Sequence, residues 1–172
     1  MLFNGTSPLI PLVLKTPSSN LVVVETDVRI VLRAHRQIGS IKGEQGGILM
    51  GERRGEHIVV THASTPGKGD RSWYSGFIRS KSRHQRFIDR IYKETQGKSN
   101  YIGEWHSHPE PNPQPSITDT SSWKRNLIAS DLHILMIVGQ RSDWWGQIIQ
   151  KNIQTLRYCE ESDLNTASHK IG

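Results

Sequence analysis

Apolar residues recur along this chain with two different periods. A spacing of three and four residues over 28–38 and again over 84–92 predicts two amphipathic helices. We expect Thr26 or Asp27 to cap the first of them, and a third helix is predicted over residues 117–129. Short apolar runs separated by turn residues predict strands. These runs cover residues 21–24, 46–51, 57–63, 72–77, 101–108, 132–138, 144–149 and 153–158.

The order of these elements indicates the fold class. Helices are mixed among strands whose pattern is largely antiparallel, so we expect an α+β fold. A length of 172 residues is typical of a single domain with its own core. We place that domain at residues 21–158. It would lie between an extended N-terminal arm (1–20), which carries turn signals, and a polar C-terminal tail (159–172).

Composition narrows the functional classes. No apolar run approaches the ~18 residues of a membrane-spanning helix, so we expect no membrane partner. The apolar segment 8–14 is short, interrupted by proline and not preceded by a basic region, which argues against a signal peptide. The single cysteine, Cys159, excludes an intramolecular disulfide and suits a reducing compartment. We therefore expect a cytoplasmic protein.

The net charge of +6 is unevenly distributed. Residues 68–98 carry nine basic side chains against three acidic ones. The basic ones are Lys68, Arg71, Arg79, Lys81, Arg83, Arg86, Arg90, Lys93 and Lys98. The basic helix, residues 79–98, is most simply a solvated surface. A second interpretation is a docking face for an acidic protein partner. Nucleic-acid binding is the weakest interpretation, because no recognition motif accompanies the charge.

The most specific chemistry in the chain begins with two histidines. His106 and His108 are two positions apart, so both imidazoles project from the same face of a strand. Alternate prolines over residues 109–115 then enforce an extended loop. Ser116 and Asp119 have the spacing of a helix cap and its third residue. Each part alone is ordinary surface polarity or capping. Together, two imidazoles and one carboxylate predict one zinc ion per chain, with a fourth position open to water.

An acidic residue further upstream completes a known pattern. Glu44 precedes the glycine-rich strand that runs to Gly51, and the His-x-His-Pro and Ser-x-x-Asp motifs follow. With these motifs, residues 24–158 resemble the JAMM/MPN (JAB domain) family of zinc metalloproteases. The resemblance implies a curved, mostly antiparallel sheet flanked by helices, with zinc at one edge of the sheet.

The same resemblance assigns roles to the motif residues. His106, His108 and Asp119 would bind zinc. Glu44 would be the general base, and Ser116 would help to hold the oxyanion. The chemistry agrees, because zinc lowers the pKa of a bound water to about 7. A carboxylate beside the metal can then take the water proton and pass it to the leaving amine.

Three further side chains have two interpretations each. Glu104 lies two residues before His106 and could itself be the base. We expect it instead to orient a ligand histidine, because the resemblance places the base at Glu44. Trp73 and Tyr74 are either ordinary core residues or the wall of a substrate groove.

The resemblance also implies a substrate class. JAMM proteases cut peptide or isopeptide bonds after the C-terminal residue of ubiquitin or a similar tail, and an extended tail can pair with a sheet edge. The compact chain, and the string from Gly103 to Pro109 in particular, is similar to bacterial stand-alone JAB proteins. These include the deconjugating peptidases of CBASS anti-phage operons. The conjugate would join the C-terminus of a cyclic-oligonucleotide synthase, a CD-NTase-like enzyme, to a target amine. E1/E2-like conjugation machinery would be the functional partner.

Three other functions are compatible with parts of the sequence. The nearest alternative is a protease of a bacterial ubiquitin-like modification pathway, which would act on a ubiquitin-like protein. A metal-free MPN scaffold is disfavoured, because none of the ligand positions is missing. A nucleic-acid-binding module rests on charge alone and would show a steep dependence of affinity on salt.

Overall fold

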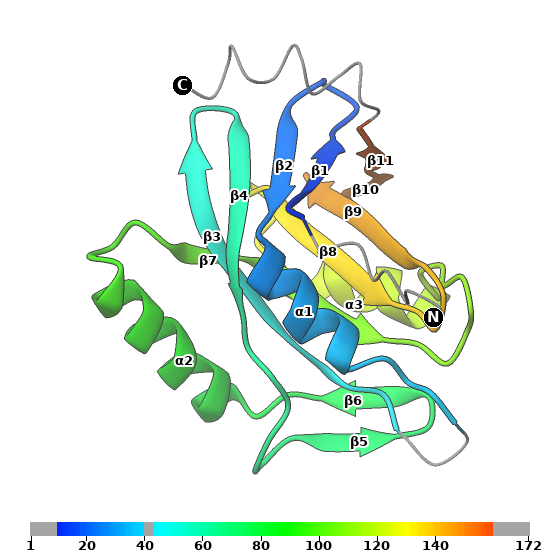
Figure 1. Ribbon diagram of the computed structural model, residues 1–172. Helices are drawn as coiled ribbons and strands as arrows, with labels where there is room; N and C mark the ends of the chain where they lie inside the picture. The colour runs from blue at the N-terminus through cyan, green and yellow to red at the C-terminus, as the bar shows by residue number, and fades with distance from the viewer. Residues whose placement is uncertain (1–9, 40–42, 160–172) are drawn as a thin grey trace, which may run out of the picture.

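The computed structural model describes residues 10–39 and 43–159 (Figure 1). Within them the strands are β1 (Leu12–Lys15), β2 (Leu21–Val24), β3 (Gly46–Arg54), β4 (His57–Ala63), β5 (Arg71–Trp73), β6 (Gly76–Ile78), β7 (Asn100–Ser107), β8 (His133–Val138), β9 (Asp143–Ile149), β10 (Asn152–Thr155) and β11 (Arg157–Tyr158). The helices are α1 (Thr26–Ala34), α2 (Lys81–Glu94) and α3 (Ile117–Asn126).

Nine of these strands form one sheet, in the order β10-β9-β8-β7-β3-β4-β2-β1-β11. Most neighbours are antiparallel, while β2 with β4 and β7 with β8 are parallel pairs. Only Leu156 separates β10 from β11, and its backbone N–H donates to the carbonyl of Trp145. The chain thus links the two ends of a curved sheet, and the α+β prediction is confirmed.

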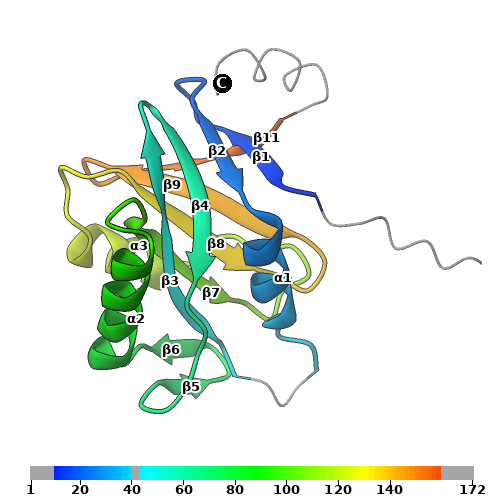
Figure 2. The ribbon, with the colours of Figure 1, turned by 60° about the vertical axis from the view of Figure 1, so that its left-hand side comes forward.

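The helices cover both faces of the sheet (Figures 1 and 2). On one face, Val28 and Leu32 of α1 join the main core, which includes Trp105 of β7. On the other face, α3 packs through Trp123 against β8 and β9, and α2 packs through Ile91 against β3. Strand β7 therefore has apolar layers on both sides, which fixes its position.

The structure corrects the predicted N-terminal boundary. Residues 12–15 are not part of an arm but form β1, in which Leu12 pairs with Val24 of β2. Leu14 is fully buried in the core. The rest of the predicted arm up to residue 9, and the tail from residue 160, lie outside the described residues.

Three local predictions also differ from the structure. Helix α1 begins after Glu25, whose side chain makes no capping hydrogen bond, so neither Thr26 nor Asp27 is the cap. Residues 72–77 are not one strand, because a turn after Trp73 divides them into the β5–β6 hairpin. Helix α3 ends at Asn126, three residues earlier than expected, since Leu127 adopts extended dihedral angles.

None of the helices found in residues 10–39 and 43–159 combines the length and the apolar character that crossing a bilayer requires.

Candidate metal centre

The two motif histidines lie at the carboxyl end of β7, in the middle of the sheet. Strand β7 pairs with β3 on one side and β8 on the other, and His108 lies just beyond the last residue of the strand. The Nε2 atoms of His106 and His108 are 3.1 Å apart. Two imidazole nitrogens at this distance repel each other through their lone pairs unless a proton or a cation lies between them. The strand thus aims two metal-binding atoms at one point.

Asp119 completes the group. Its Oδ1 lies 3.2 Å from His106 Nε2, and its Oδ2 lies 3.3 Å from His108 Nε2. Among the described residues, these three form the one His/Cys/Asp/Glu group able to hold a metal, with ligand atoms all within 4.8 Å of one another. Two imidazoles and a carboxylate suit zinc and leave a coordination position open. The donor set therefore fits the metal that the motif predicts.

The proline loop brings Asp119 back to the histidines because it is tied to the β8–β9 turn. The backbone N–H of Gln140 donates to the carbonyl of Glu110, and the N–H groups of Arg141 and Ser142 donate to that of Pro111. Helix α3 then begins with the predicted cap. The Ser116 hydroxyl accepts the Asp119 N–H at 3.1 Å, and Asp119 Oδ2 accepts the Ser116 N–H at 2.7 Å. This reciprocal capping fixes the Asp119 carboxylate at the site.

Ser116 is exposed, as its predicted role requires. Its hydroxyl also donates to Asp119 Oδ2 at 2.7 Å. A serine hydroxyl has a single proton, so it can donate either to Asp119 or to an oxyanion, but not to both.

Glu44 reaches the site from the segment before β3, where the β5–β6 hairpin holds its backbone. The Glu44 N–H donates to the carbonyl of Trp73 at 2.8 Å, and the Ser72 hydroxyl donates to the Glu44 carbonyl at 2.5 Å. A Cβ at Gly43 would lie 2.3 Å from the Ser72 hydroxyl oxygen, so only glycine permits this approach. The hairpin thus holds the backbone of Glu44 in place through two hydrogen bonds.

The pKa of the Glu44 carboxyl depends on its burial and on the charges of the other motif residues. Burial raises its pKa, while charge interactions with His106 and His108 lower it, and the net pKa lies above its ordinary value. A buried carboxyl with a raised pKa is suited to taking up and releasing a proton near neutral pH. The structure therefore brings together Glu44 and the three candidate ligands.

Burial and neighbouring groups also have opposite effects on the pKa values of the candidate ligands Asp119 and His108. Burial raises the pKa of Asp119, but hydrogen bonds from His106 and His108 outweigh it and hold that pKa well below its usual range. Burial lowers the pKa of His108, but the hydrogen bond to Asp119 and the Asp119 charge outweigh it, so the pKa of His108 is raised. Asp119 is therefore anionic and matched to a cation in the centre.

Ser107 was missed by sequence reasoning, although its position between the two histidines is a usable signal. In a strand it must face away from them. Its hydroxyl accepts the Gln45 N–H at 2.9 Å, and its own N–H donates to the Gln45 carbonyl at 2.7 Å. The Gln45 side chain in turn lies 2.5 Å from His35 Nδ1. These contacts hold the segment that carries Glu44 against the end of β7.

Glu104 does not have the predicted role. Its carboxylate forms an ion pair with Arg79, which also donates to the carbonyl of Gly47 at 3.0 Å. Neither His106 nor His108 is a hydrogen-bond partner of Glu104 among the described residues. Strand alternation placed it on the histidine face, but an arginine from the segment before α2 neutralises it.

Two other side chains surround the histidines. The Nδ1 atom of His108 lies 3.1 Å from Glu110 Oε2, although the geometry does not qualify as a hydrogen bond. The His106 ring lies 5.7 Å from that of Trp123, which stacks on Trp144. Glu110 is thus the carboxylate nearest to the outer face of a candidate ligand, the place predicted for Glu104.

The aromatic pair on the β5–β6 hairpin is not part of the core. Trp73 is 48% exposed and Tyr74 58% exposed, so the core interpretation is wrong. The Trp73 ring lies against Gly76, where an added Cβ would come within 2.2 Å of it. The pair stands on the hairpin that holds Glu44, which leaves the substrate-groove prediction in place.

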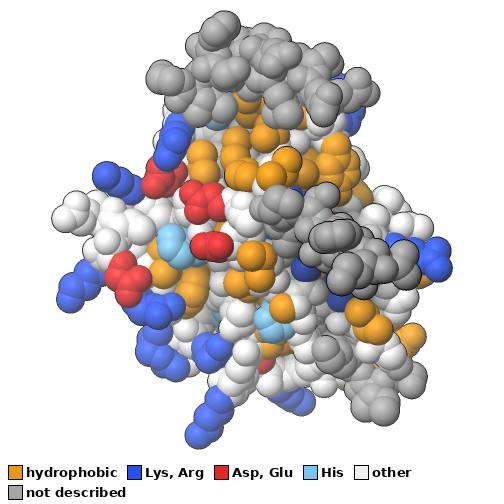
Figure 3. Space-filling view, in the orientation of Figure 1, with side chains coloured by type: hydrophobic (Ala, Val, Ile, Leu, Met, Phe, Trp, Pro, Cys, Tyr) orange, Lys and Arg blue, Asp and Glu red, His pale blue; other side chains and the backbone are white. Residues whose placement is uncertain are grey.

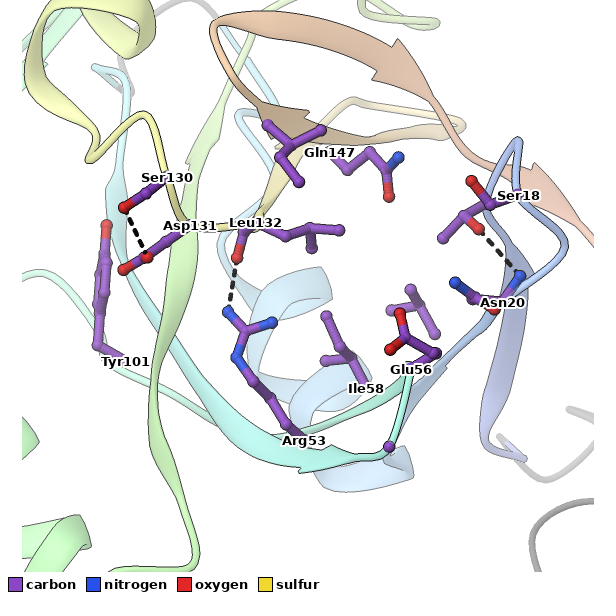
Figure 4. Close-up of a pocket in the computed structure, with 14 residues that line it drawn as sticks. Ser18, Asn20, Arg53, Glu56, Ile58, Tyr101, Ser130, Asp131, Leu132 and Gln147 are labelled. Atoms are coloured by element: carbon purple, nitrogen blue, oxygen red, sulfur yellow. Dashed lines mark hydrogen bonds between the residues drawn. The ribbon is translucent and has the colours of Figure 1, made fainter.

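Two other hollows lie apart from the metal centre. A cavity of about 490 Å³ opens near the start of β7, at the end opposite to the histidines (Figure 4). Its labelled lining residues include Arg53, Tyr101 and Gln147, and it contains no predicted site residue. A second groove runs along α2, where Lys and Arg side chains gather (Figure 3). Arg83, Arg86, Phe87 and Arg90 line it.

A curved sheet that gathers two histidines, an aspartate and a buried glutamate is typical of a JAB-type domain, and the three candidate ligands could hold a metal ion. The comparison with known families agrees. The family described as prokaryotic homologs of the JAB domain matches residues 26–151. The chain belongs to this prokaryotic JAB family.

Particular relatives are closer still. A protein of Vibrio cholerae named CD-NTase/cGAS isopeptidase is 39% identical over 151 residues, which cover 88% of this chain and 97% of the relative. A protein of the same name from Escherichia coli (strain TW11681) is 38% identical over 138 residues, 80% of this chain and 88% of the relative. Among solved structures, the protein DSY2949 from Desulfitobacterium hafniense shares the fold. Its TM-score is 0.58 at 18% identity, with 78% of this chain and 88% of that one covered.

Proposed function

We propose that this chain is a zinc-dependent isopeptidase that releases a CD-NTase, the cyclic-oligonucleotide synthase of CBASS defence, from an amine to which its C-terminus is joined. The observation that carries the proposal is the convergence of His106, His108 and Asp119 beside the buried carboxyl of Glu44. Relatives of 38% and 39% identity that are named CD-NTase/cGAS isopeptidases support the substrate class.

The metal would be held by His106, His108 and Asp119. Bound there, zinc would supply Lewis-acid polarisation of the attacking water and of the scissile carbonyl. The protein contributes a fixed geometry, because β7, the capping interaction of Asp119 and the loop anchored on Pro111 hold all three ligands. Little reorganisation is then needed when the substrate binds.

Glu44 would act as the proton carrier. Its carboxylate accepts a proton from the attacking water while the water oxygen bonds to the carbonyl carbon. The carbon–nitrogen bond then breaks, and Glu44 returns the proton to the departing amine. The products are a free C-terminal carboxylate and the unmodified amine. The raised pKa of Glu44 supports both halves of this transfer.

Ser116 would stabilise the oxyanion that forms at the scissile carbonyl. Its hydroxyl donates to Asp119 in the structure, so this role requires the hydroxyl to rotate toward the substrate. The Ser116 backbone N–H keeps its hydrogen bond to Asp119 meanwhile, so the helix cap is retained.

The substrate would approach as an extended C-terminal tail. Trp73 and Tyr74 are exposed on the hairpin beside Glu44 and would pack against such a tail. E1/E2-like conjugation machinery would form the bond that this enzyme removes. A ubiquitin-like protein in place of the CD-NTase is the alternative substrate.

The experiment is substrate capture in the native host. A Glu44→Ala variant retains the three candidate ligands and should accumulate high-mass adducts that mass spectrometry identifies. We expect CD-NTase peptides joined through their C-terminus to a lysine, and chelator-sensitive cleavage of these adducts by the wild type. Adducts of a ubiquitin-like protein would establish the alternative. No adducts, with the variant behaving as wild type, would contradict deconjugation altogether.

A further inference from the structure

A second histidine–carboxylate cluster is buried beside β7, the strand that carries His106. The hydroxyl of Ser64, which follows β4, lies 2.7 Å from Nδ1 of His84 in α2. The Nε2 of His84 lies 3.2 and 3.3 Å from the two carboxylate oxygens of Asp70. Ser64 and His84 are only 3% and 4% exposed. We call these three residues the support triad.

The proton positions in the support triad follow from chemistry. A carboxylate only accepts hydrogen bonds, so Nε2 of His84 must carry the proton that Asp70 accepts. Burial lowers the pKa of His84, in agreement with a neutral ring. Nδ1 then offers a lone pair, and the Ser64 hydroxyl must donate to it. The Ser64 oxygen is left as an acceptor, which the Ile48 N–H uses at 2.9 Å.

Ser64 connects the two strands that carry the candidate site. Its hydroxyl and N–H both pair with the backbone of Ile48 in β3, four residues after Glu44. Its carbonyl accepts the Trp105 indole N–H at 2.9 Å, one residue before His106 in β7. A Cβ at Gly47 would lie 2.3 Å from the Ser64 carbonyl and 2.7 Å from Trp105 Nε1. This close approach explains why the second residue of β3 is a glycine.

Asp70 anchors the triad in turn. Its Oδ2 accepts the Gly67 N–H at 2.8 Å, and its Oδ1 accepts the Ser80 N–H at 2.6 Å, at the start of α2. The carboxylate therefore orders the 64–70 loop and fixes the ring of His84 at once.

The same residue types occur in serine hydrolases, but the geometry opposes that chemistry. A nucleophilic serine passes its proton to a histidine whose other nitrogen faces the acid, as it does in this cluster, but it must also be accessible. Ser64 is buried, and its oxygen is occupied by the Ile48 N–H. The cluster has the contacts of a support rather than of a nucleophile.

We propose that Ser64 and His84 are positioning residues that set the Glu44 segment against the histidine strand. Without the hydroxyl of Ser64, the Ile48 N–H loses the partner that joins β3 to the segment after β4. Without an acceptor at position 84, the Ser64 hydroxyl loses its orientation. Small displacements of a catalytic group are costly, about 10²-fold in rate for 1 Å. The inference rests on the proposed function, since it concerns the rate that Glu44 supports.

The test compares Ser64→Ala, His84→Leu and His84→Gln in the full chain, with Gln85→Leu as the matched control on the exposed side of α2. Glutamine can accept from Ser64 and donate to Asp70, whereas leucine can do neither. For Ser64→Ala and His84→Leu we expect kcat to fall about tenfold to 10²-fold, with KM and zinc stoichiometry nearly unchanged. His84→Gln should restore most of kcat, and the control should match the wild type.

Hydrogen exchange of the Ile48 amide gives a readout that does not depend on cleavage. We expect it to accelerate in Ser64→Ala and His84→Leu but not in His84→Gln. If the wild type itself cleaves nothing, the proposed function fails while this readout still tests the support. Unchanged kcat and exchange in Ser64→Ala would overturn the proposal, and so would loss of zinc alone. Labelling of Ser64 by a fluorophosphonate would show a nucleophile in place of a support.

Discussion

The metal centre and the support triad are built from the same chemistry and arranged in opposite ways. At the metal centre, Nε2 atoms of His106 and His108 face each other at 3.1 Å, and one carboxylate serves both. In the support triad each nitrogen of His84 has its own partner. The first cluster could hold a cation between its nitrogens, whereas in the second each nitrogen already has a hydrogen-bond partner. Imidazoles and carboxylates can form a metal site when their ligand atoms face one common point, and they form a structural contact when each atom is already hydrogen-bonded.

The largest expected effect is the loss of zinc from a variant of the metal centre, compared with a variant of the support triad that keeps it. His108→Ala should lose zinc and reduce cleavage by about 10³-fold or more, because a zinc site with two protein ligands binds weakly and no longer positions the reacting water. His84→Gln should keep one zinc per chain. Metal analysis of the purified proteins checks this. Full zinc content in His108→Ala would show that the metal lies elsewhere.

The next effect concerns the two glutamates. Glu44→Gln should reduce kcat by about 10²- to 10⁴-fold while zinc stays bound, because the amide cannot carry a proton. Glu104→Gln should retain most of kcat, since Arg79 is the partner of that carboxylate. Single-turnover cleavage and metal analysis measure both variants. An active Glu44→Gln beside an inactive Glu104→Gln would reverse the assignment.

The triad should also influence stability as pH changes. The pKa of His84 is lowered on folding, chiefly by burial, so the unfolded chain binds its proton more readily. Its contribution to stability is fully present above the unfolded pKa of about 6.5 and is lost as pH falls from there through the folded pKa. His133 shifts in the same direction. Denaturant unfolding between pH 5 and 8 should therefore show a shallower slope in His84→Gln, and an unchanged slope would contradict a neutral, buried His84.

The smallest expected effect lies at the hairpin. Trp73→Ala should raise KM for the conjugate a few-fold, with kcat and zinc content nearly unchanged, since a partly exposed aromatic contact contributes about 0.5–1.5 kcal/mol. Steady-state kinetics of the purified variant measure this. A loss of kcat equal to that of Glu44→Gln would mean that Trp73 acts through the Glu44 backbone instead.

The sequence could predict that His106, His108 and Asp119 lie together, because the information for their placement is local. The spacing of His106 and His108, and the capping pattern of Ser116 and Asp119, each fix geometry within a few residues. Glu44 lies outside this local pattern and was assigned through a family resemblance.

The remaining features depend on distant segments. Ser64, Asp70 and His84 spread over 21 residues with no periodic signature, so only the folded chain brings them together. Strand β1 is four residues long and was assigned to an arm, because turn signals precede and follow it in the sequence. Glu104 was placed on the correct face, but the position of Arg79 could not be inferred from strand alternation.

The most direct test of the central claim is product analysis of a defined conjugate. A CD-NTase joined through its C-terminal carboxyl to a lysine of a carrier protein is incubated with the zinc-loaded wild type and with Glu44→Gln. Mass spectrometry should show an intact CD-NTase with a free C-terminal carboxylate and a carrier with an unmodified lysine. A chelator should prevent this and added zinc should restore it, while Glu44→Gln should leave the conjugate whole. An intact conjugate with the wild type, or equal cleavage by Glu44→Gln, would contradict the account.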